Sequence, residues 1–324
     1  MIKRVKKVSF IILPVLLGVF LIWYSISKLS PSDIQAIKTS FKTANYWWVV
    51  LSLVFGILSH FSRAYRWQFL LEPLGYKPKF ANSVMAVLIA YLLNLFIPRS
   101  GEFARAASIK KYDKIPFDMA FGTIVAERVS DAIMLLSVIG VAFLLQADLI
   151  GSYVFKDNAE STFLSKVIFL VILPLIGYLL FRRLKKSKNK FINKVILFIN
   201  GLLDGVKSIL QMKKKWQFIF HTIFIWFMYI LMFYAVTFAL PETTNLPFSA
   251  VIVGFVVGGL SMALTNGGLG TYPVLVAGAL AIYNVPTNPA LAFGWIMWTA
   301  QTIMVILFGC MSLLLMPIYN KYKK

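Results

Sequence analysis

Long apolar runs recur along the whole length of this chain, and they constrain its fold more than any other feature. Each run covers about 16 to 28 residues, and a helix needs roughly 20 to cross a bilayer. The chain is 59% hydrophobic and only 14% charged, a composition that soluble proteins of 324 residues do not have. We therefore predict an all-α polytopic integral membrane protein with one membrane domain over residues 1–324.

The apolar runs and the charges of the loops predict how the chain crosses the membrane. The basic start and long first run favour a retained span over a cleaved signal peptide, because no small-residue cleavage site follows. Lys and Arg favour the cytoplasmic side, so both termini are expected there, in a bacterial inner membrane. The expected full spans are 8–27, 45–61, 119–145, 163–181, 217–240 and 289–316.

Two further regions, 81–112 and 248–283, do not fit the charge pattern as single spans. A full crossing by the first would leave the basic residues after it on the outside, against the positive-inside rule. A re-entrant hairpin, entering and leaving on one face, keeps these residues inside. The second region must then enter from the opposite face, because the last span ends inside.

Each of these regions contains an apolar helix, a break with glycine, and a second helix. The breaks are residues 98–101 in the first region and "TNGGLG", residues 265–270, in the second. Broken backbone at membrane depth is tolerated where protein or a water-filled cavity surrounds it, and alternating-access transporters use opposed pairs of such elements. An ordinary fold of eight spans, with "TNGGLG" as a plain loop, is the alternative.

The remaining features of the sequence predict an interfacial helix and argue against nucleic-acid, disulfide and metal sites. Apolar residues at helical spacing over 191–211 predict an interfacial helix on the inner leaflet. The net charge of +21 fits cytoplasmic loops that touch anionic lipids better than it fits nucleic acid. The one cysteine, Cys310, excludes an intrachain disulfide, and His60 and His221 are isolated in the sequence. We expect no metal and no cofactor.

Charged residues inside apolar runs cost roughly 2.5–3.5 kcal/mol each and need a partner or a function. In "AERVSD", Glu127 and Asp131 share a helix face, and Arg128 can reach Asp131 at a spacing of three. This charge network, with Glu102, is either an ion-pair network between helices or part of a site. Arg63 and Arg66 are either interfacial residues that snorkel to the membrane surface or part of the same site.

The first break has the clearest functional signal. Arg99 and Arg105 flank a helix that would start near Gly101, where the positive end of the helix dipole lies. Guanidinium groups and free backbone N–H groups suit a phosphate, and a lipid head group carries one at this depth. The predicted lipid- or phosphate-binding residues are Arg99, Arg105, Arg63, Arg66, Gly101, Gly267, Gly268 and Gly270.

At these residues the chain resembles a known family. "PRSGEFAR", then "ERVSD" about twenty residues later and a late "GGLG", resemble the lysylphosphatidylglycerol synthase transmembrane region, or flippase-like domain, family. The resemblance extends over nearly the whole chain and implies Arg99, Gly101, Glu102, Arg105, Glu127, Arg128, Asp131 and 267–270 as site residues. Many members carry an acid after the glycine loop. This chain has "GLGTYP" there, so no acidic role is carried over to the second break.

The resemblance also implies a function. In two-part members the membrane domain moves aminoacylated phospholipid across the bilayer, and a soluble domain makes that lipid. We expect no such soluble domain here, so the resemblance implies lipid translocation across the cytoplasmic membrane, with membrane lipids as partners. No G-x-x-x-x-G-K-[ST] motif is present, so transport would be downhill or coupled to ions through the acids.

Two alternatives to a transporter stay open at this point. One is a membrane-embedded enzyme on lipid-linked substrates, with Glu127 or Asp131 as general base. The sequence has neither a nucleophile–base pair nor metal-ligand spacing to support it. The other is a partner subunit that recruits a separate lipid-modifying enzyme.

Overall fold

The computed structural model describes residues 30–146 and 209–321, with scattered residues outside these ranges. The chain divides into two compact units. The first unit combines residues 1–125 and 216–324, and the second comprises residues 126–215. Each unit is described by itself below. The predicted spans 8–27 and 163–181 and the interfacial helix 191–211 lie largely outside the described residues.

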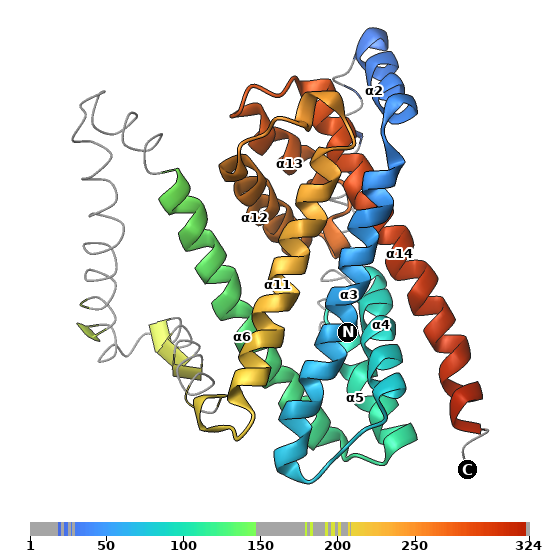
Figure 1. Cartoon of the computed structure of the whole chain (residues 1–324), viewed down its shortest axis with the longest axis vertical. Coiled ribbons are helices and arrows are strands. Elements are labelled where there is room, and N and C mark those ends of the chain that lie inside the picture. The colour runs from blue at the N-terminus through green and yellow to red at the C-terminus, as the bar shows by residue number, and fades with distance from the viewer. Residues whose placement is uncertain are drawn as a thin grey trace, which may run out of the picture. The chain divides into compact units, whose positions relative to one another are not determined.

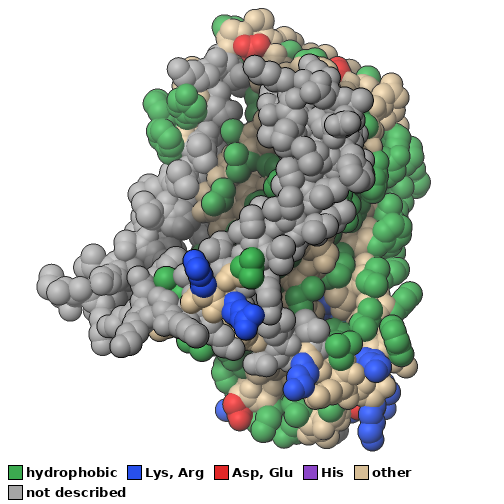
Figure 2. Space-filling model, turned by 90° about the vertical axis from the view of Figure 1, so that its left-hand side faces the viewer, with side chains coloured by type: hydrophobic (Ala, Val, Ile, Leu, Met, Phe, Trp, Pro, Cys, Tyr) green, Lys and Arg blue, Asp and Glu red, His purple; other side chains and the backbone are tan. Residues whose placement is uncertain are grey.

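Every described element is helical, and four helices are long and apolar enough to cross a membrane (Figure 1). These are α3 (Tyr46–Leu71), α6 (Phe117–Leu145), α11 (Lys215–Thr237) and α14 (Thr287–Lys321). They coincide with four of the predicted spans. Large hydrophobic side chains are exposed on the described surface, green in Figure 2, as a bilayer-facing surface requires. The prediction of an all-α polytopic membrane protein is confirmed.

Helix α3 is longer than the sequence pattern predicts. The apolar run ends near residue 61, but the helix continues to Leu71 without a break. Its last three turns have a polar face that packs inside the protein, so Arg63 and Arg66 lie on the span itself. Because both side chains are buried, the prediction that they snorkel to the membrane surface is wrong.

The shorter helices form two antiparallel pairs, each with a break at its tip. The first pair is α4 (Phe80–Phe96) and α5 (Ser100–Asp113), which pack closely along their length. The second pair is α12 (Phe248–Leu264) and α13 (Thr271–Ala281), joined through the 3-10 turn η4 (Asn266–Gly268). The breaks fall within one or two residues of the predicted positions. That these pairs are re-entrant in the bilayer stays a prediction.

Helix α14 contacts both pairs and sets their order along its axis. Near its start, a Cβ on Gly294 would lie 2.7 Å from Cα of Pro273 in α13. Fifteen residues later, a Cβ on Gly309 would lie 2.6 Å from Cβ of Leu92 in α4. At about 1.5 Å per residue, these contacts are roughly 22 Å apart. The two pairs therefore lie end to end along α14 (Figure 1).

The tips of the two pairs meet between these contacts. A Cβ on Gly267, in the second break, would lie 2.7 Å from Cδ2 of Leu95, near the end of α4. Trp298 of α14 donates its indole N–H to the Gly267 carbonyl oxygen at 2.8 Å. The first unit thus places both interrupted backbones next to each other, within a layer of apolar helices.

Side-chain amides and carboxylates tie the elements together at the two ends of this unit. At one end Asn82 of α4 and Asn320 of α14 exchange amide hydrogen bonds of 2.8 and 3.1 Å, and Asn82 also donates to Asp113 of α5 at 2.9 Å. At the other end Asn288 of α14 donates to Asp33 of α2 (Pro31–Thr43) at 2.8 Å. The open end of the first pair, where α4 begins and α5 ends, lies near the end of α14. The open end of the second pair, where α12 begins and α13 ends, lies near the start of α14.

The short helix α2 is an element that the span-based interpretation missed. Ser30 and Asp33 form a capping box, in which Asp33 N–H donates to Ser30 Oγ and Ser30 N–H donates to Asp33 Oδ2. The sequence "SPSD" carries this signal, because a serine followed by an acid three residues later satisfies two backbone donors at a helix start.

Candidate functional site

Three arginines are buried in the first unit, where most residues are apolar. The exposed fraction of the side chain is 4% for Arg63, 0% for Arg66 and 3% for Arg105. Arg63 and Arg66 come from α3, and Arg105 comes from α5, three residues after Glu102. Buried charges in proteins need hydrogen bonds, partners or polarisable surfaces, so their surroundings indicate what they do.

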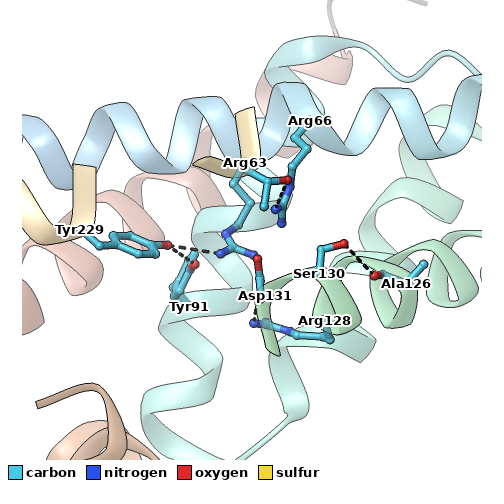
Figure 3. Close-up of polar contacts among 9 residues, drawn as sticks. Arg63, Arg66, Tyr91, Ala126, Arg128, Ser130, Asp131 and Tyr229 are labelled. Atoms are coloured by element: carbon cyan, nitrogen blue, oxygen red, sulfur yellow. Dashed lines mark hydrogen bonds and ion pairs between the residues drawn. The ribbon is translucent and has the colours of Figure 1, made fainter. Parts of the chain in front are cut away.

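Arg63 contacts two linked tyrosine hydroxyls, so that polar side chains connect α3, α11 and α4. Its Nη2 donates to the hydroxyl of Tyr229 in α11 at 3.4 Å. The Tyr229 hydroxyl lies 3.0 Å from the hydroxyl of Tyr91 in α4 (Figure 3).

Arg66 points to a different part of α11. Its Nη1 donates to the Thr222 hydroxyl at 2.9 Å, and its guanidinium carbon lies 5.3 Å from the centre of the Phe218 ring. The positive group therefore rests on an aromatic face, which stabilises a desolvated cation. Arg63 and Arg66, one turn apart on α3, thus contact α11 at two different residues, Tyr229 and Thr222.

Arg105 stacks on an indole ring. Its guanidinium carbon lies 3.9 Å from the ring centre of Trp67, a fully buried residue of α3. The indole N–H of Trp67 donates to the Thr123 hydroxyl at 2.9 Å, which fixes the plane of the ring. Arginine suits this position better than lysine because its planar cation stacks on the ring and keeps N–H donors at its edges.

The first break is held by side-chain hydrogen bonds and close packing. The backbone N–H of Gly101 donates to Asn94 Oδ1 at 2.8 Å, so this amide is already used within the hairpin. A Cβ on Gly101 would overlap the backbone carbonyl of Ala90. The structure therefore gives Gly101 a packing role, and its contribution to phosphate binding stays a prediction.

The charged residues of the first break occupy different environments. Arg99 is exposed at the tip, in the left-handed conformation with φ of 63°, just before α5 begins. Glu102 is half-buried in the first turn of α5, where the helix dipole favours a negative charge. Arg99 and Arg105 therefore do not form a matched pair at the tip: one is at the surface, and the other is buried against α3.

The second break is formed by glycine backbone and threonine hydroxyls. Gly267, Gly268 and Gly270 all have positive φ, between 62° and 76°. Thr265 Oγ1 donates to the Leu269 carbonyl at 3.0 Å and lies 2.8 Å from Thr271 Oγ1, which donates to the Ser261 carbonyl. This segment contains no charged residue, and its conformation depends on the glycines.

The second unit holds three members of the predicted charge network, Glu127, Arg128 and Asp131, all on α6. Glu127 is buried, with an exposed fraction of 1%. Arg128 Nη1 lies 3.8 Å from Asp131 Oδ2, in agreement with their spacing of three (Figure 3). The Arg128 side chain is 45% exposed, so this ion pair adds little stability by itself.

The sequence analysis missed several neutral members of the site. Tyr91 and Tyr229 lie inside apolar runs, and Trp67 follows Arg66 directly, so none of the three stands out in the sequence. Their polar groups could have indicated them, because a Tyr hydroxyl or Trp N–H within a span usually has a hydrogen-bond partner. The histidines are not isolated either, since Ser62 Oγ lies 2.8 Å from His221 Nδ1 and the His60 ring contacts Tyr91.

The arrangement can bind an anion within an apolar layer. The buried arginines supply N–H donors, and the tyrosine and threonine hydroxyls can donate or accept. Among the described residues, no group of three His, Cys, Asp or Glu side chains could hold a metal ion.

Comparisons with known proteins place the chain in a family. The model of a family described as "Lysylphosphatidylglycerol synthase TM region" matches residues 11–309. A protein described as "UPF0104 membrane protein MJ1595", from Methanocaldococcus jannaschii, is 25% identical over 300 residues, which cover 83% of this chain and 84% of that protein. No solved structure matches the chain. The resemblance drawn from the motifs is confirmed, and the chain belongs to the lysylphosphatidylglycerol synthase transmembrane-region family.

Proposed function

We propose that this protein translocates a phospholipid, or another lipid with a phosphate in its head group, across the cytoplasmic membrane. The observation that carries the proposal is the burial of Arg63, Arg66 and Arg105 on two neighbouring helices of a membrane protein. An arginine at membrane depth is costly, and such residues commonly mark a substrate pathway. The family name supports the link to phospholipids.

The three arginines suit an anion such as a phosphate, not a cation. Their guanidinium groups contact hydroxyl groups and aromatic rings, and the planar fork of a guanidinium matches the oxygens of a phosphate in bidentate hydrogen bonds. A phosphate diester offers two charged oxygens to such donors. Arg99, exposed at the tip of the first break, would receive the head group before it reaches the buried residues.

The two breaks give the lipid a route between the membrane faces. Their tips meet at Leu95 and Gly267, and each helix pair opens toward a different end of the unit. In our proposal the head group passes from the arginine side of this contact to the glycine side, while the acyl chains stay in the bilayer. Separation of the tips would open this route, in the manner of paired discontinuous elements in transporters.

The experiment is a leaflet-exchange assay with the purified full chain in liposomes. Fluorescent phosphatidylglycerol is placed in both leaflets, and a membrane-impermeant reductant quenches the label that reaches the outside. We expect wild-type protein to raise the quenched fraction above the half that protein-free liposomes show. The variants Arg99→Ala and Arg105→Gln should reduce the rate at least tenfold, because each removes a phosphate ligand.

The matched control is Lys110→Ala, an exposed basic residue on the same helix as Arg105. It should transfer lipid at the wild-type rate, which separates a specific site from a general effect of positive charge. Wild-type rates in both arginine variants would refute the proposed site. Quenching equal to that of protein-free liposomes, with phosphatidylglycerol and with phosphatidylethanolamine, would refute phospholipid translocation itself.

A further inference from the structure

His60 is a buried polar residue that the proposed transport route does not yet use. Its side chain is 5% exposed, and it lies on α3 one turn before Arg63. Neither ring nitrogen has a hydrogen-bond partner among the described residues. Buried imidazole nitrogens in folded proteins usually have such a partner, so this one needs an explanation.

The His60 ring lies beside the tyrosine hydroxyls that contact Arg63. Its centre lies 4.4 Å from the ring centre of Tyr91, at an interplanar angle of 39°. The Tyr91 hydroxyl is next to that of Tyr229, which in turn accepts from Arg63 (Figure 3). These four side chains, from α3, α4 and α11, form what we call the polar ring.

Two members of the polar ring are partly exposed. His60 and Arg63 are buried, whereas Tyr91 and Tyr229 are only half-buried. The two tyrosines therefore border the ring, and the two nitrogen-bearing side chains lie deeper. A small anionic group that displaces the contact between the tyrosine hydroxyls would reach both α3 residues.

We propose that His60 is a ligand of the phosphate in a lipid head group and donates its ring N–H to a phosphate oxygen beside Arg63. The neutral imidazole has one N–H donor and one acceptor nitrogen, so it can share an oxyanion with a guanidinium without adding charge. This inference rests on the proposed function, because it assumes that a lipid phosphate enters the arginine layer.

Ring packing is the competing explanation, and two substitutions separate it from hydrogen bonding. His60→Phe keeps an aromatic ring against Tyr91 and removes both nitrogens. His60→Gln removes the ring and keeps an amide that can donate. If His60 binds phosphate, the Phe variant loses affinity and the Gln variant keeps most of it. If His60 only packs, the order is reversed.

The test measures binding of dihexanoyl phosphatidylglycerol, and separately of inorganic phosphate, to the purified full chain by calorimetry. We expect His60→Phe to weaken lipid binding about tenfold, the loss of one hydrogen bond to a charged group. His60→Gln should stay within about threefold of wild type. Inorganic phosphate should bind more weakly than the lipid. Equal and equally His60-dependent binding of both probes would assign the site to free phosphate and overturn the head-group proposal.

Ser83→Ala is the matched control. Ser83 is also fully buried, and its hydroxyl has no partner among the described residues. It lies two turns before Tyr91 on α4, outside the polar ring. We expect wild-type lipid affinity from this variant. A loss equal to that of His60→Phe would show a general effect of altering buried polar atoms and would overturn the proposal.

A measurement on the unmodified side chain covers the case in which His60→Phe does not fold. The chain has two histidines, so imidazole ¹⁵N resonances of the wild-type protein are assigned with one His221→Gln sample. Addition of the short-chain lipid should shift the His60 nitrogens. Unchanged His60 resonances at saturating lipid would overturn the inference.

The outcomes separate this inference from the proposed function. Lipid binding that depends on His60, without leaflet exchange in liposomes, would support the inference and refute translocation. Leaflet exchange that depends on Arg105, with wild-type binding and exchange in His60→Phe, would support translocation and overturn the role of His60.

Discussion

The two interrupted helix pairs have the same outline but hold their breaks by different means. In the first pair, Asn94 accepts from the Gly101 amide, and Ser100 donates to the carbonyls of Leu93 and Ile97. In the second pair, three glycines take positive φ, and a threonine pair closes the turn. The first break carries Arg99 and Glu102, while the second is uncharged.

This difference shows that the two breaks can do different tasks. A break built from side-chain bonds and tight packing keeps its charged neighbours in fixed positions, as a binding site requires. A break that depends on glycine φ angles has fewer side-chain constraints and can change conformation at lower cost. The first break should therefore be sensitive to added volume, and the second to added backbone strain.

The largest effect is expected at Gly101. In Gly101→Ala the new methyl group would overlap the backbone carbonyl of Ala90, which cannot move without separating α4 from α5. Overpacking of this kind costs about 3 kcal/mol. The measurement is the midpoint of unfolding of the detergent-purified protein in sodium dodecyl sulfate.

The control for this substitution is Gly122→Ala on α6, where a Cβ would meet nothing within 4 Å. That variant should unfold at or slightly above the wild-type midpoint, because alanine favours a helix. A Gly101→Ala protein as stable as wild type would show that α4 and α5 are not packed as closely as the structure has them.

A smaller effect is expected at Gly267, at the contact between the tips. Gly267→Ala places a side chain at φ of 62°, which costs roughly 1–2 kcal/mol, and it pushes on Leu95 Cδ2. Leu95 can rotate away, so the loss should stay below that of Gly101→Ala. In the double variant with Leu95→Ala, the packing part of the loss should disappear while the backbone part remains.

The double-mutant cycle on unfolding midpoints measures this coupling. Additive effects of the two substitutions would mean that the tips do not touch. The result thus tests the contact on which the transport route depends.

Hydropathy, loop charges and glycine positions were enough to predict the four spans that the structure describes and the positions of both breaks. The break at "TNGGLG" was predicted because clustered glycines cannot continue a helix, and α12 and α13 stop on either side of it. The end of α3 was placed ten residues too early, because hydropathy treats Arg63 and Arg66 as loop residues. Their burial depends on α11, which lies about 150 residues later in the chain.

The buried polar cluster was visible in the sequence only in part, for the same reason. Arginines among apolar segments stand out, so Arg63, Arg66 and Arg105 were singled out, and their role in binding stays a prediction. Their neutral partners do not stand out, since tyrosine and tryptophan are common in spans and at their ends. The bond between the Gly101 amide and Asn94, seven residues earlier, was not predicted either, because sequence patterns do not include such a bond.

A third test compares one hydroxyl from each break. Thr271→Val keeps the shape of the buried side chain but removes the hydroxyl that lies beside Thr265 and donates to the Ser261 carbonyl. This should cost about 1 kcal/mol in the unfolding measurement. Ser100→Ala at the first break should cost less, because Ser100 is only half-buried and water can replace its bonds. The opposite order would contradict the view that the second break depends on its threonines.

The smallest effect concerns the carboxylate at the end where α14 begins. Hydrogen bonds from the Ser30 hydroxyl, the Asn288 amide and the Ser30 backbone N–H hold the pKa of Asp33 below its usual value of 3.8. Because the pKa is lower in the folded protein, the stabilisation is complete above that usual value. It is lost as the pH falls below 3.8 and Asp33 takes up a proton.

Asp33→Asn should therefore lower the unfolding temperature at pH 7 and have a smaller effect at pH 3. The comparison is the difference between wild type and variant at each pH, since other carboxylates titrate in both proteins. Lys38→Ala, on the same helix, should give a difference that does not change between these two pH values, because it removes no carboxylate. If the Asp33→Asn difference were equally large at pH 3 and pH 7, the bond to Asn288 would not depend on the charge of Asp33. The link between α2 and α14 would then depend on neutral hydrogen bonding and packing and not on the carboxylate charge.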